Sequence, residues 1–246
     1  MVTTPRPSPS QPRVAVAGAT GLIGRSVLAL LASRVPPAGI PRPSAITALV
    51  RQPSQLVGLP AGVKGQWVDL AALGRAGVEG LPPLDWAVCC LGTTIKAAGS
   101  QSAFRAVDFD AVLAFARAAK VAGASRLAVV SAMGAQAHSA VFYNRVKGEM
   151  EQALVALGMP RLVIVQPALL LGERAALGQP RRPGEALAQR WLPRVAGLLP
   201  RSLRPIRADA VALAMLAALA DDGPPVSRLR SDQLQALANL GQAPRR

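Results

Sequence analysis

The stretch RVAVAGATGLIG, Arg13–Gly24, decides the expected fold. Its first part, Val14–Ala17, is a short apolar run of the kind that forms a buried strand. Three glycines follow at a spacing of three residues: Gly18, Gly21 and Gly24. Helical spacing of leucines then runs over residues 21–33. A strand, a glycine turn and a helix in this order predict the first unit of a parallel α/β sheet.

Strands and helices alternate along the chain up to about residue 170. Apolar runs predict further strands at residues 45–50, 63–68, 86–91, 126–130 and 161–166. Helices are expected at residues 103–121, 139–157 and 209–220. This alternation predicts an α/β fold, a Rossmann-type doubly wound parallel sheet with a small C-terminal helical segment on the substrate side.

The two ends of the chain differ from this core. Residues 1–12 are proline-rich and predict a disordered tail, and residues 225–246 are expected to form a polar C-terminal tail. Residues 13–224 then form a single Rossmann domain, with 171–224 as its substrate-side lobe. We expect no transmembrane segment, since the apolar run at 210–220 is well short of the roughly 20 residues that a span needs. No apolar signal segment opens the chain, so a cytoplasmic location is expected.

The net charge is +15, from 28 basic and 13 acidic residues. Such a balance is typical of nucleic-acid binders. However, only four of the basic residues are lysines, and aromatic residues make up 3% of the chain. Arginine-biased composition therefore explains the charge more simply, and few stacking platforms are available for bases. We expect no specific nucleic-acid partner.

Residues 174–208 concentrate positive charge, with eight arginines and a single acid, Glu185. Two interpretations stay open. The arginines bind an anionic small-molecule substrate, or dock on an acidic partner or a membrane surface. Alternatively, they reflect the arginine bias of the whole chain. The oligomeric state is also open, with a homodimer as one alternative.

The glycine turn is suited to a dinucleotide. Glycine permits the tight turn and the close approach of backbone to a pyrophosphate, and the next helix presents free N–H groups to the phosphates. NAD-binding proteins place an acid after the second strand, whereas NADP-binding proteins use arginine there. This strand ends at Arg51 without an acid, and Arg25 follows the third glycine, so NADP(H) is favoured over NAD(H). The alternative is that both are ordinary surface arginines.

Two further strand ends supply candidate cofactor contacts. Asp69, just past the third expected strand, is a candidate acceptor for the adenine amine, or a cap for the helix that follows. Residues 91–93 end the fourth strand, where a doubly wound sheet holds its ligand. Cys89 and Cys90 are expected to be core residues, because adjacent side chains of a strand point to opposite faces. No cluster suggests a metal, and His138 is expected in an exposed loop.

Tyr143 is the only tyrosine of the chain, and Lys147 lies four residues later in an expected helix. This spacing places both side chains on one helix face. An ammonium beside a phenol stabilises the phenolate, so the phenol exchanges a proton with a substrate oxygen near neutral pH. Ser131, at the end of the fifth strand, is a candidate to hold the same oxygen. The alternative is a tyrosine packed at a helix surface with the lysine in solvent.

These motifs together resemble the short-chain dehydrogenase/reductase superfamily, in its extended and atypical members. GATGLIG is similar to its glycine motif, and YNRVK carries its Tyr-x-x-x-Lys pair. Shorter strings resemble the Tat-interacting-protein branch of NAD(P)H-binding oxidoreductases: CCLGTT (89–94), VDFD (107–110), SAMGA (131–135), YNRVKGEME (143–151) and RPGE (182–185).

The resemblance implies hydride transfer between a nicotinamide and a carbonyl or alcohol carbon of a small molecule. It implies catalytic roles for Ser131, which positions the carbonyl, Tyr143, the acid/base, and Lys147, which also binds the nicotinamide ribose. Pro167 and the residues after it would contact the nicotinamide. The candidate cofactor-binding set is Gly18, Thr20, Gly21, Leu22, Ile23, Gly24, Arg25, Arg51, Asp69, Leu70, Leu91, Gly92, Thr93, Lys147, Pro167 and Leu169.

The chain also departs from the superfamily pattern. Asp108 stands where many extended members have Asn, which puts a proton relay through Asn in doubt. The segment after Gly172 is short for a sugar-nucleotide epimerase. The resemblance therefore implies an NADP-dependent oxidoreductase, with an NADPH-binding regulatory or assembly protein without turnover as the alternative.

Overall fold

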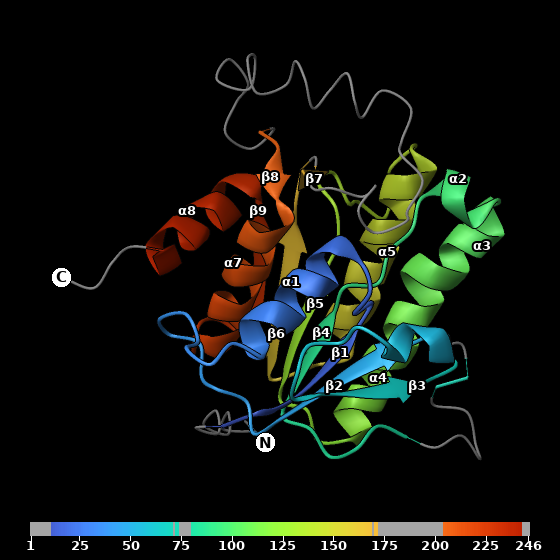
Figure 1. Cartoon of the computed structure of the whole chain (residues 1–246). Helices are drawn as coiled ribbons and strands as arrows, with labels where there is room; N and C mark the ends of the chain where they lie inside the picture. Colours follow the sequence, from blue (N-terminus) through green and yellow to red (C-terminus); the bar gives the residue numbers. More distant parts are fainter. Residues whose placement is uncertain (1–10, 71, 74–79, 169, 172–203, 243–246) are drawn as a thin grey trace, which may run out of the picture.

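The computed structural model describes residues 11–70, 72–73, 80–168, 170–171 and 204–242. These residues form three layers, a parallel sheet between two groups of helices (Figure 1). The sheet has seven strands in the order β3-β2-β1-β4-β5-β6-β9, and neighbouring strands are parallel. The expected Rossmann-type doubly wound sheet is thereby confirmed.

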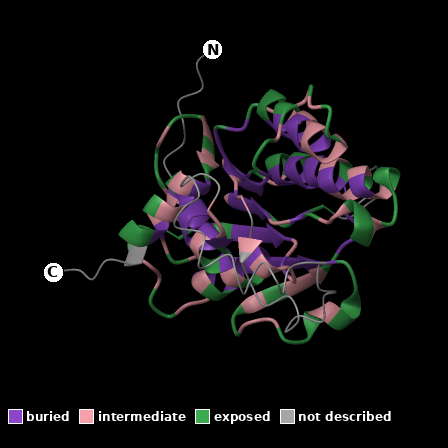
Figure 2. Cartoon of the chain, turned by 90° about the horizontal axis from the view of Figure 1, so that it is seen from above, coloured by how far each residue is buried: buried purple, intermediate pink, exposed green. Residues whose placement is uncertain are grey.

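Six strands of this sheet match the expected apolar runs closely: β1 (Arg13–Ala17), β2 (Ala45–Val50), β3 (Val63–Trp67), β4 (Trp86–Cys89), β5 (Arg126–Val130) and β6 (Arg161–Gln166). The seventh strand, β9 (Val226–Arg230), was not expected. Two short strands, β7 (Leu170–Leu171) and β8 (Ile206–Arg207), pair separately. The central strands are buried as a middle layer (Figure 2), because helices cover both of their faces. This explains why they are continuous apolar runs.

Helices of the two faces pack in separate core clusters. The helices are α1 (Leu22–Leu31), α2 (Ile95–Ala98), α3 (Gln101–Arg105), α4 (Val112–Val121), α5 (Phe142–Ala156), α7 (Ala208–Ala220) and α8 (Ser231–Gln242), with a 3-10 turn η1 (Pro53–Leu56). Residues of α1, α7 and α8 share one cluster, and residues of α4 and α5 share the other. A π-helical turn, η2 (Ala106–Ala111), joins α3 to α4 within the expected helix 103–121. Its wider winding carries the fully buried Asp108, and such turns are frequent at functional sites.

The polar C-terminal tail expected for 225–246 is wrong for most of its length. Residues 226–230 form β9, which extends the sheet beside β6, and α8 follows it and buries Leu234 and Ala238. The sequence of β9 lacks the continuous apolar run of the other strands, because an edge strand needs few apolar residues. Its residues Arg228 and Arg230 alternate with partly buried neighbours.

Much of the expected substrate-side lobe, and residues 1–10 of the expected N-terminal tail, lie outside the described residues. Helix α7 falls within residues 171–224, where the substrate-side lobe is expected, but it packs differently from a separate lobe. It is buried along most of its length against α1 and the sheet, so it belongs to a covering layer of the main domain. None of the helices in the described part of the chain combines the length and apolar content of a membrane span.

Candidate functional site

The glycine loop lies between β1 and α1, packed against the end of β4. Gly18 has φ +74°, and a Cβ there would lie 2.5 Å from the carbonyl of Cys90. A Cβ on Gly24 would lie 2.1 Å from the Gly18 carbonyl oxygen. Both positions therefore require glycine, since an added side chain would collide with backbone.

The first turn of α1 is suited to an anion. Its N-cap, Gly21, makes no side-chain capping bond, and no acidic residue lies in the first turn. Arg25 adds positive charge there, and its Nε donates to the Thr20 carbonyl at 3.1 Å. Free N–H groups and a positive helix end beside a guanidinium form a site that fits a pyrophosphate, with Leu22 and Ile23 in the same turn.

Arg51 is held at the end of β2 through its backbone. Its N–H donates to Gln55 Oε1 at 3.1 Å, and its carbonyl accepts from Trp67 Nε1 at 3.1 Å. Trp67 is 59% exposed, so the indole lies at the surface beside the exposed arginine. Asp69 and Leu70 follow β3, with Asp69 exposed and Leu70 buried. These residues lie at the carboxyl edge of the sheet, where the adenosine half of a dinucleotide is expected.

A buried ion pair lies between η2 and α5. Lys147 Nζ is 2.8 Å from Asp108 Oδ1 and 3.4 Å from the Val130 carbonyl oxygen. Asp108 Oδ2 accepts the N–H of Thr93 at 2.8 Å, which joins the loop after β4 to the pair. A Cβ on Gly92 would lie 3.9 Å from Lys147 Nζ, so Gly92, one of the expected cofactor contacts, lies next to the lysine.

Tyr143 lines a hollow of about 360 Å³ at the same edge of the sheet. The other lining residues are Thr94, Ile95, Ala132, Met133, Pro167 and Ala168. Tyr143 also packs against the buried Phe104, with ring centroids 5.3 Å apart. The expected Tyr143 and Pro167 thus meet in one pocket, whereas Leu169 lies outside the described residues.

Ser131 departs from its expected orientation. Its hydroxyl donates to Glu151 Oε1 at 2.5 Å, and the residue of this segment that lines the hollow is Ala132. Glu151 is nearly fully buried and also accepts from Gln166 and Arg228. Adjacent residues at a strand end point to opposite sides, so turning Ser131 toward α5 puts Ala132 beside Tyr143. In this structure the Ser131 hydroxyl thus points to Glu151 and not into the hollow, and its contact with a substrate oxygen stays a prediction.

The buried Glu151 is a residue that sequence reasoning missed. It lies eight residues after Tyr143, which places it about two turns further along the same helix, but its partners come from β5, β6 and β9. The available signal was the position of this acid on the same helix face as Met150 and Leu154, which are buried.

Cys89 is a core residue, as expected, whereas Cys90 is partly buried and packs against the core. Burial raises the pKa of the Cys89 thiol to about 12. Burial also raises the pKa of the Cys90 thiol. Among the described residues, no group of three or more His, Cys, Asp or Glu side chains could hold a metal ion.

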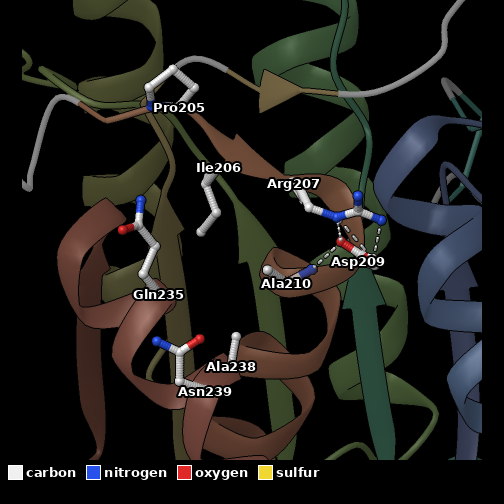
Figure 3. A pocket seen from close by; sticks show the side chains of 8 residues that line it. All are labelled: Pro205, Ile206, Arg207, Asp209, Ala210, Gln235, Ala238 and Asn239. Atoms are coloured by element: carbon white, nitrogen blue, oxygen red, sulfur yellow. Dashed lines mark hydrogen bonds and ion pairs between the residues drawn. The ribbon is translucent and has the colours of Figure 1, made fainter. Parts of the chain in front are cut away.

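A second hollow, of about 460 Å³, lies between β8, the start of α7 and α8 (Figure 3). The Gln235 and Asn239 side chains reach toward it from α8, opposite Ile206. Its charged residues, Arg207 and Asp209, form an ion pair with each other. Among the described residues that line it there is no tyrosine or lysine.

Comparison with known proteins identifies the family of this chain. The model of the NAD(P)H-binding family matches residues 18–189. This chain belongs to the NAD(P)H-binding family. The mitochondrial protein fmp52 of Aspergillus fumigatus, a relative of this NAD(P)H-binding protein, is 34% identical over 223 residues, which cover 87% of the chain and 91% of the relative.

Other relatives match over shorter stretches. Protein HTATIP2 of Rattus norvegicus is 40% identical over 118 residues, 48% of the chain and 45% of the relative. The mitochondrial protein FMP52-1 of Scheffersomyces stipitis is 45% identical over 83 residues, 34% of the chain and 37% of that protein. For several curated relatives, then, the match spans well under two thirds of their length. The resemblance to the Tat-interacting-protein branch is nevertheless confirmed.

The fold likeness extends to the extended short-chain dehydrogenase/reductase and epimerase superfamily. The Bordetella bronchiseptica enzyme WbmG in complex with NAD has a TM-score of 0.62 at 14% identity, and the match covers 99% of this chain and 81% of that one. The relatives correct one expectation. The fungal FMP52 proteins are named mitochondrial, which contradicts the expected cytoplasmic location.

Proposed function

We propose that this NAD(P)H-binding protein is an oxidoreductase that interconverts a carbonyl and an alcohol with NADP(H). The observation that carries the proposal is the single tyrosine, Tyr143, which lines a hollow together with Thr94 of the loop after β4 and lies four residues before the buried Lys147 on α5. The hollow and the loop after β4 lie at the carboxyl edge of the sheet, and the glycine loop at this edge fits a pyrophosphate.

The cofactor would be held by three groups of residues. The α1 N-terminus with Arg25 binds the pyrophosphate, Arg51 binds the 2′-phosphate, and Gly92, Thr93 and Pro167 lie along the nicotinamide half. Arg51 is well placed for this role because two side chains hold its backbone while its guanidinium lies at the surface. A forked guanidinium discriminates a phosphate from a hydroxyl by charge and by paired donors.

When bound, NADPH would supply the hydride to the carbonyl carbon and would itself be oxidised to NADP⁺. The C=O π bond breaks as the C–H bond forms, and the carbonyl oxygen takes the proton of the Tyr143 phenol. Solvent returns one proton to the phenolate, so a carbonyl, NADPH and H⁺ give an alcohol and NADP⁺. Lys147 positions the nicotinamide ribose and stabilises the phenolate, while Asp108 holds its ammonium in place.

Tyr143→Phe tests the chemistry. It removes the proton donor and keeps the ring that packs on Phe104. We expect kcat for NADPH oxidation with a panel of aldehydes and ketones to fall by at least about 100-fold, with an unchanged Kd for NADPH.

Arg51→Ala tests the cofactor assignment, and the Kd for NADPH should rise about tenfold while that for NADH stays constant. Retained turnover in Tyr143→Phe would refute the proposed chemistry. Equal affinities of the wild type for NADPH and NADH would refute the cofactor assignment.

A second function is favoured by one observation. The Ser131 hydroxyl is held by Glu151 and the Lys147 charge is paired by Asp108, so Tyr143 has less support than the expected triad would give. An NADPH-binding regulatory protein without turnover fits this arrangement. Tight NADPH binding with no NADPH oxidation across the panel would favour it.

A further inference from the structure

The hollow beside Tyr143 offers a second hydroxyl. Seven of the described residues line it, and among these only Tyr143 and Thr94 carry a hydroxyl; the side chains of Ile95, Ala132, Met133, Pro167 and Ala168 have no hydrogen bond to donate. Negative charge develops on the substrate oxygen as hydride arrives, and a second preorganised donor stabilises it. The expected second donor, Ser131, does not line the hollow.

The Ser131 hydroxyl hydrogen is already committed. It lies in the 2.5 Å bond to Glu151, an acceptor that two more donors, Gln166 and Arg228, hold in place. Turning Ser131 into the hollow would remove one donor from a carboxylate that is 4% exposed. Leaving a buried carboxylate under-satisfied is costly, so the observed rotamer is the favoured one.

The Thr94 hydroxyl differs from that of Ser131, because it accepts a hydrogen bond instead of donating one. Its Oγ1 accepts the N–H of Ala97 at 3.1 Å, which fixes the position of the oxygen at the start of α2. A hydroxyl that accepts one bond still has its hydrogen to donate. Thr94 also follows Thr93, whose N–H is bound by Asp108, so the loop that carries the hydroxyl is tied to the Lys147 pair.

We propose that Thr94 donates the second hydrogen bond to the substrate oxygen that receives the proton of Tyr143. The inference rests on the proposed function and adds a substrate-contacting residue to it. In the proposed reduction, the hydride forms the C–H bond, the π electrons of the carbonyl move to its oxygen, and the Tyr143 proton forms the O–H bond. The Thr94 hydroxyl keeps its own proton throughout and stabilises the charge on the oxygen.

Substitutions at Thr94 separate its hydroxyl from its capping role. Thr94→Val keeps the shape and loses the hydroxyl, and kcat should fall by about 100-fold with an unchanged Kd for NADPH. Thr94→Ser should recover most of that loss. Ser100→Ala is the matched control, because Ser100 caps the next short helix by accepting the N–H of Ala103 and lies outside the residues that line the hollow. It should match the thermal stability of Thr94→Val and retain turnover.

A spectroscopic measurement complements the kinetics. The probe is the panel carbonyl with the highest kcat/KM, bound with NADP⁺ in a dead-end complex. Its infrared C=O stretch should lie at higher frequency in Thr94→Val than in the wild type, since one hydrogen bond is lost.

The outcomes distinguish this inference from the function on which it rests. Turnover in the wild type that Tyr143→Phe abolishes and Thr94→Val preserves would overturn the role of Thr94 alone. A larger loss in Ser131→Ala than in Thr94→Val would also overturn it. No turnover in the wild type would overturn the proposed function and this inference together.

Discussion

The Lys147 ammonium and the Asp108 carboxylate lie 2.8 Å apart, and both side chains are almost completely buried. The pair joins α5 to η2, two segments that are 39 positions apart at these residues. Removing one member of a buried pair leaves an uncompensated charge, which costs far more than the pair itself contributes.

We expect Asp108→Leu to lower the free energy of unfolding by about 3–5 kcal/mol, measured by urea denaturation. The double variant Asp108→Leu/Lys147→Met should be less destabilised than Asp108→Leu alone, because no buried charge remains. The coupling would be contradicted if the loss of stability in the double variant equalled the sum of the losses in the two single variants.

Trp67 controls Arg51 through the hydrogen bond from its indole to the Arg51 carbonyl. Trp67→Phe keeps an aromatic ring and removes this donor. We expect the Kd for NADPH to rise about threefold to tenfold, and the Kd for NADH to stay constant, in calorimetric titrations. Gln55→Ala, which removes the other backbone contact of Arg51, should act in the same direction. A parallel loss for both cofactors would show that Trp67 acts on something other than the 2′-phosphate.

Gly24 is required where α1 passes the glycine loop. In Gly24→Ala the new Cβ would meet the Gly18 carbonyl oxygen at 2.1 Å, so the loop or the helix must move. We expect NADPH binding to fall at least tenfold, or the chain to lose stability by several kcal/mol, in titration and melting experiments. Gly80→Ala is the control, since a Cβ there meets nothing within 4 Å. Wild-type affinity and stability in Gly24→Ala would rule out this account of the loop.

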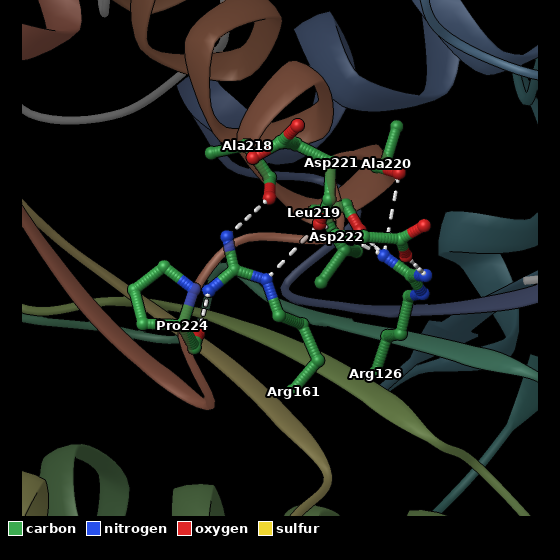
Figure 4. Close-up of polar contacts among 8 residues, drawn as sticks. All are labelled: Arg126, Arg161, Ala218, Leu219, Ala220, Asp221, Asp222 and Pro224. Carbon is green, nitrogen blue, oxygen red and sulfur yellow. Dashed lines mark hydrogen bonds and ion pairs between the residues drawn. The ribbon is translucent and has the colours of Figure 1, made fainter. Parts of the chain in front are cut away.

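Two arginines hold the end of α7 (Figure 4). Arg126 and Arg161 are register partners on β5 and β6, and both donate to carbonyl groups at the C-terminal end of the helix. The Arg161 guanidinium donates to the carbonyls of Ala218 at 2.8 Å and Asp221 at 3.2 Å, and to that of Pro224. The negative end of the helix dipole adds to these bonds.

Burial lowers the pKa of Arg161, which reflects its partly desolvated position. We expect Arg161→Met to reduce the free energy of unfolding by about 2–4 kcal/mol in urea denaturation, because several carbonyls lose a charged donor. Arg207→Met is the comparison: it removes an exposed arginine that pairs with Asp209, and its effect should be much smaller, because solvent screens an exposed ion pair. Equal effects of the two substitutions would contradict this assignment.

Local patterns were sufficient to predict the first part of this fold and site. The glycine turn after β1 and the pairing of Tyr143 with Lys147 depend on spacings of three and four residues, which the backbone converts directly into a turn or a helix face. The buried runs of β1, β4 and β5 are equally local, since strands covered on both faces are continuously apolar. The edge strand β9 was not predicted, because its burial is partial and the partner of its Arg228 side chain, Glu151, comes from another part of the chain.

The sequence by itself thus determined the Rossmann-type sheet, the glycine loop and the candidate acid/base pair. The tertiary structure decided which groups surround that pair. Asp108 meets Lys147 only because a π turn and α5 pack together, and Glu151 meets Ser131 only because α5 lies on β5. Whether Ser131 or Ala132 faces Tyr143 depends on a shift of one residue at a strand end, which reverses the direction of a side chain. That direction is set by long-range packing and by the need to satisfy a buried carboxylate.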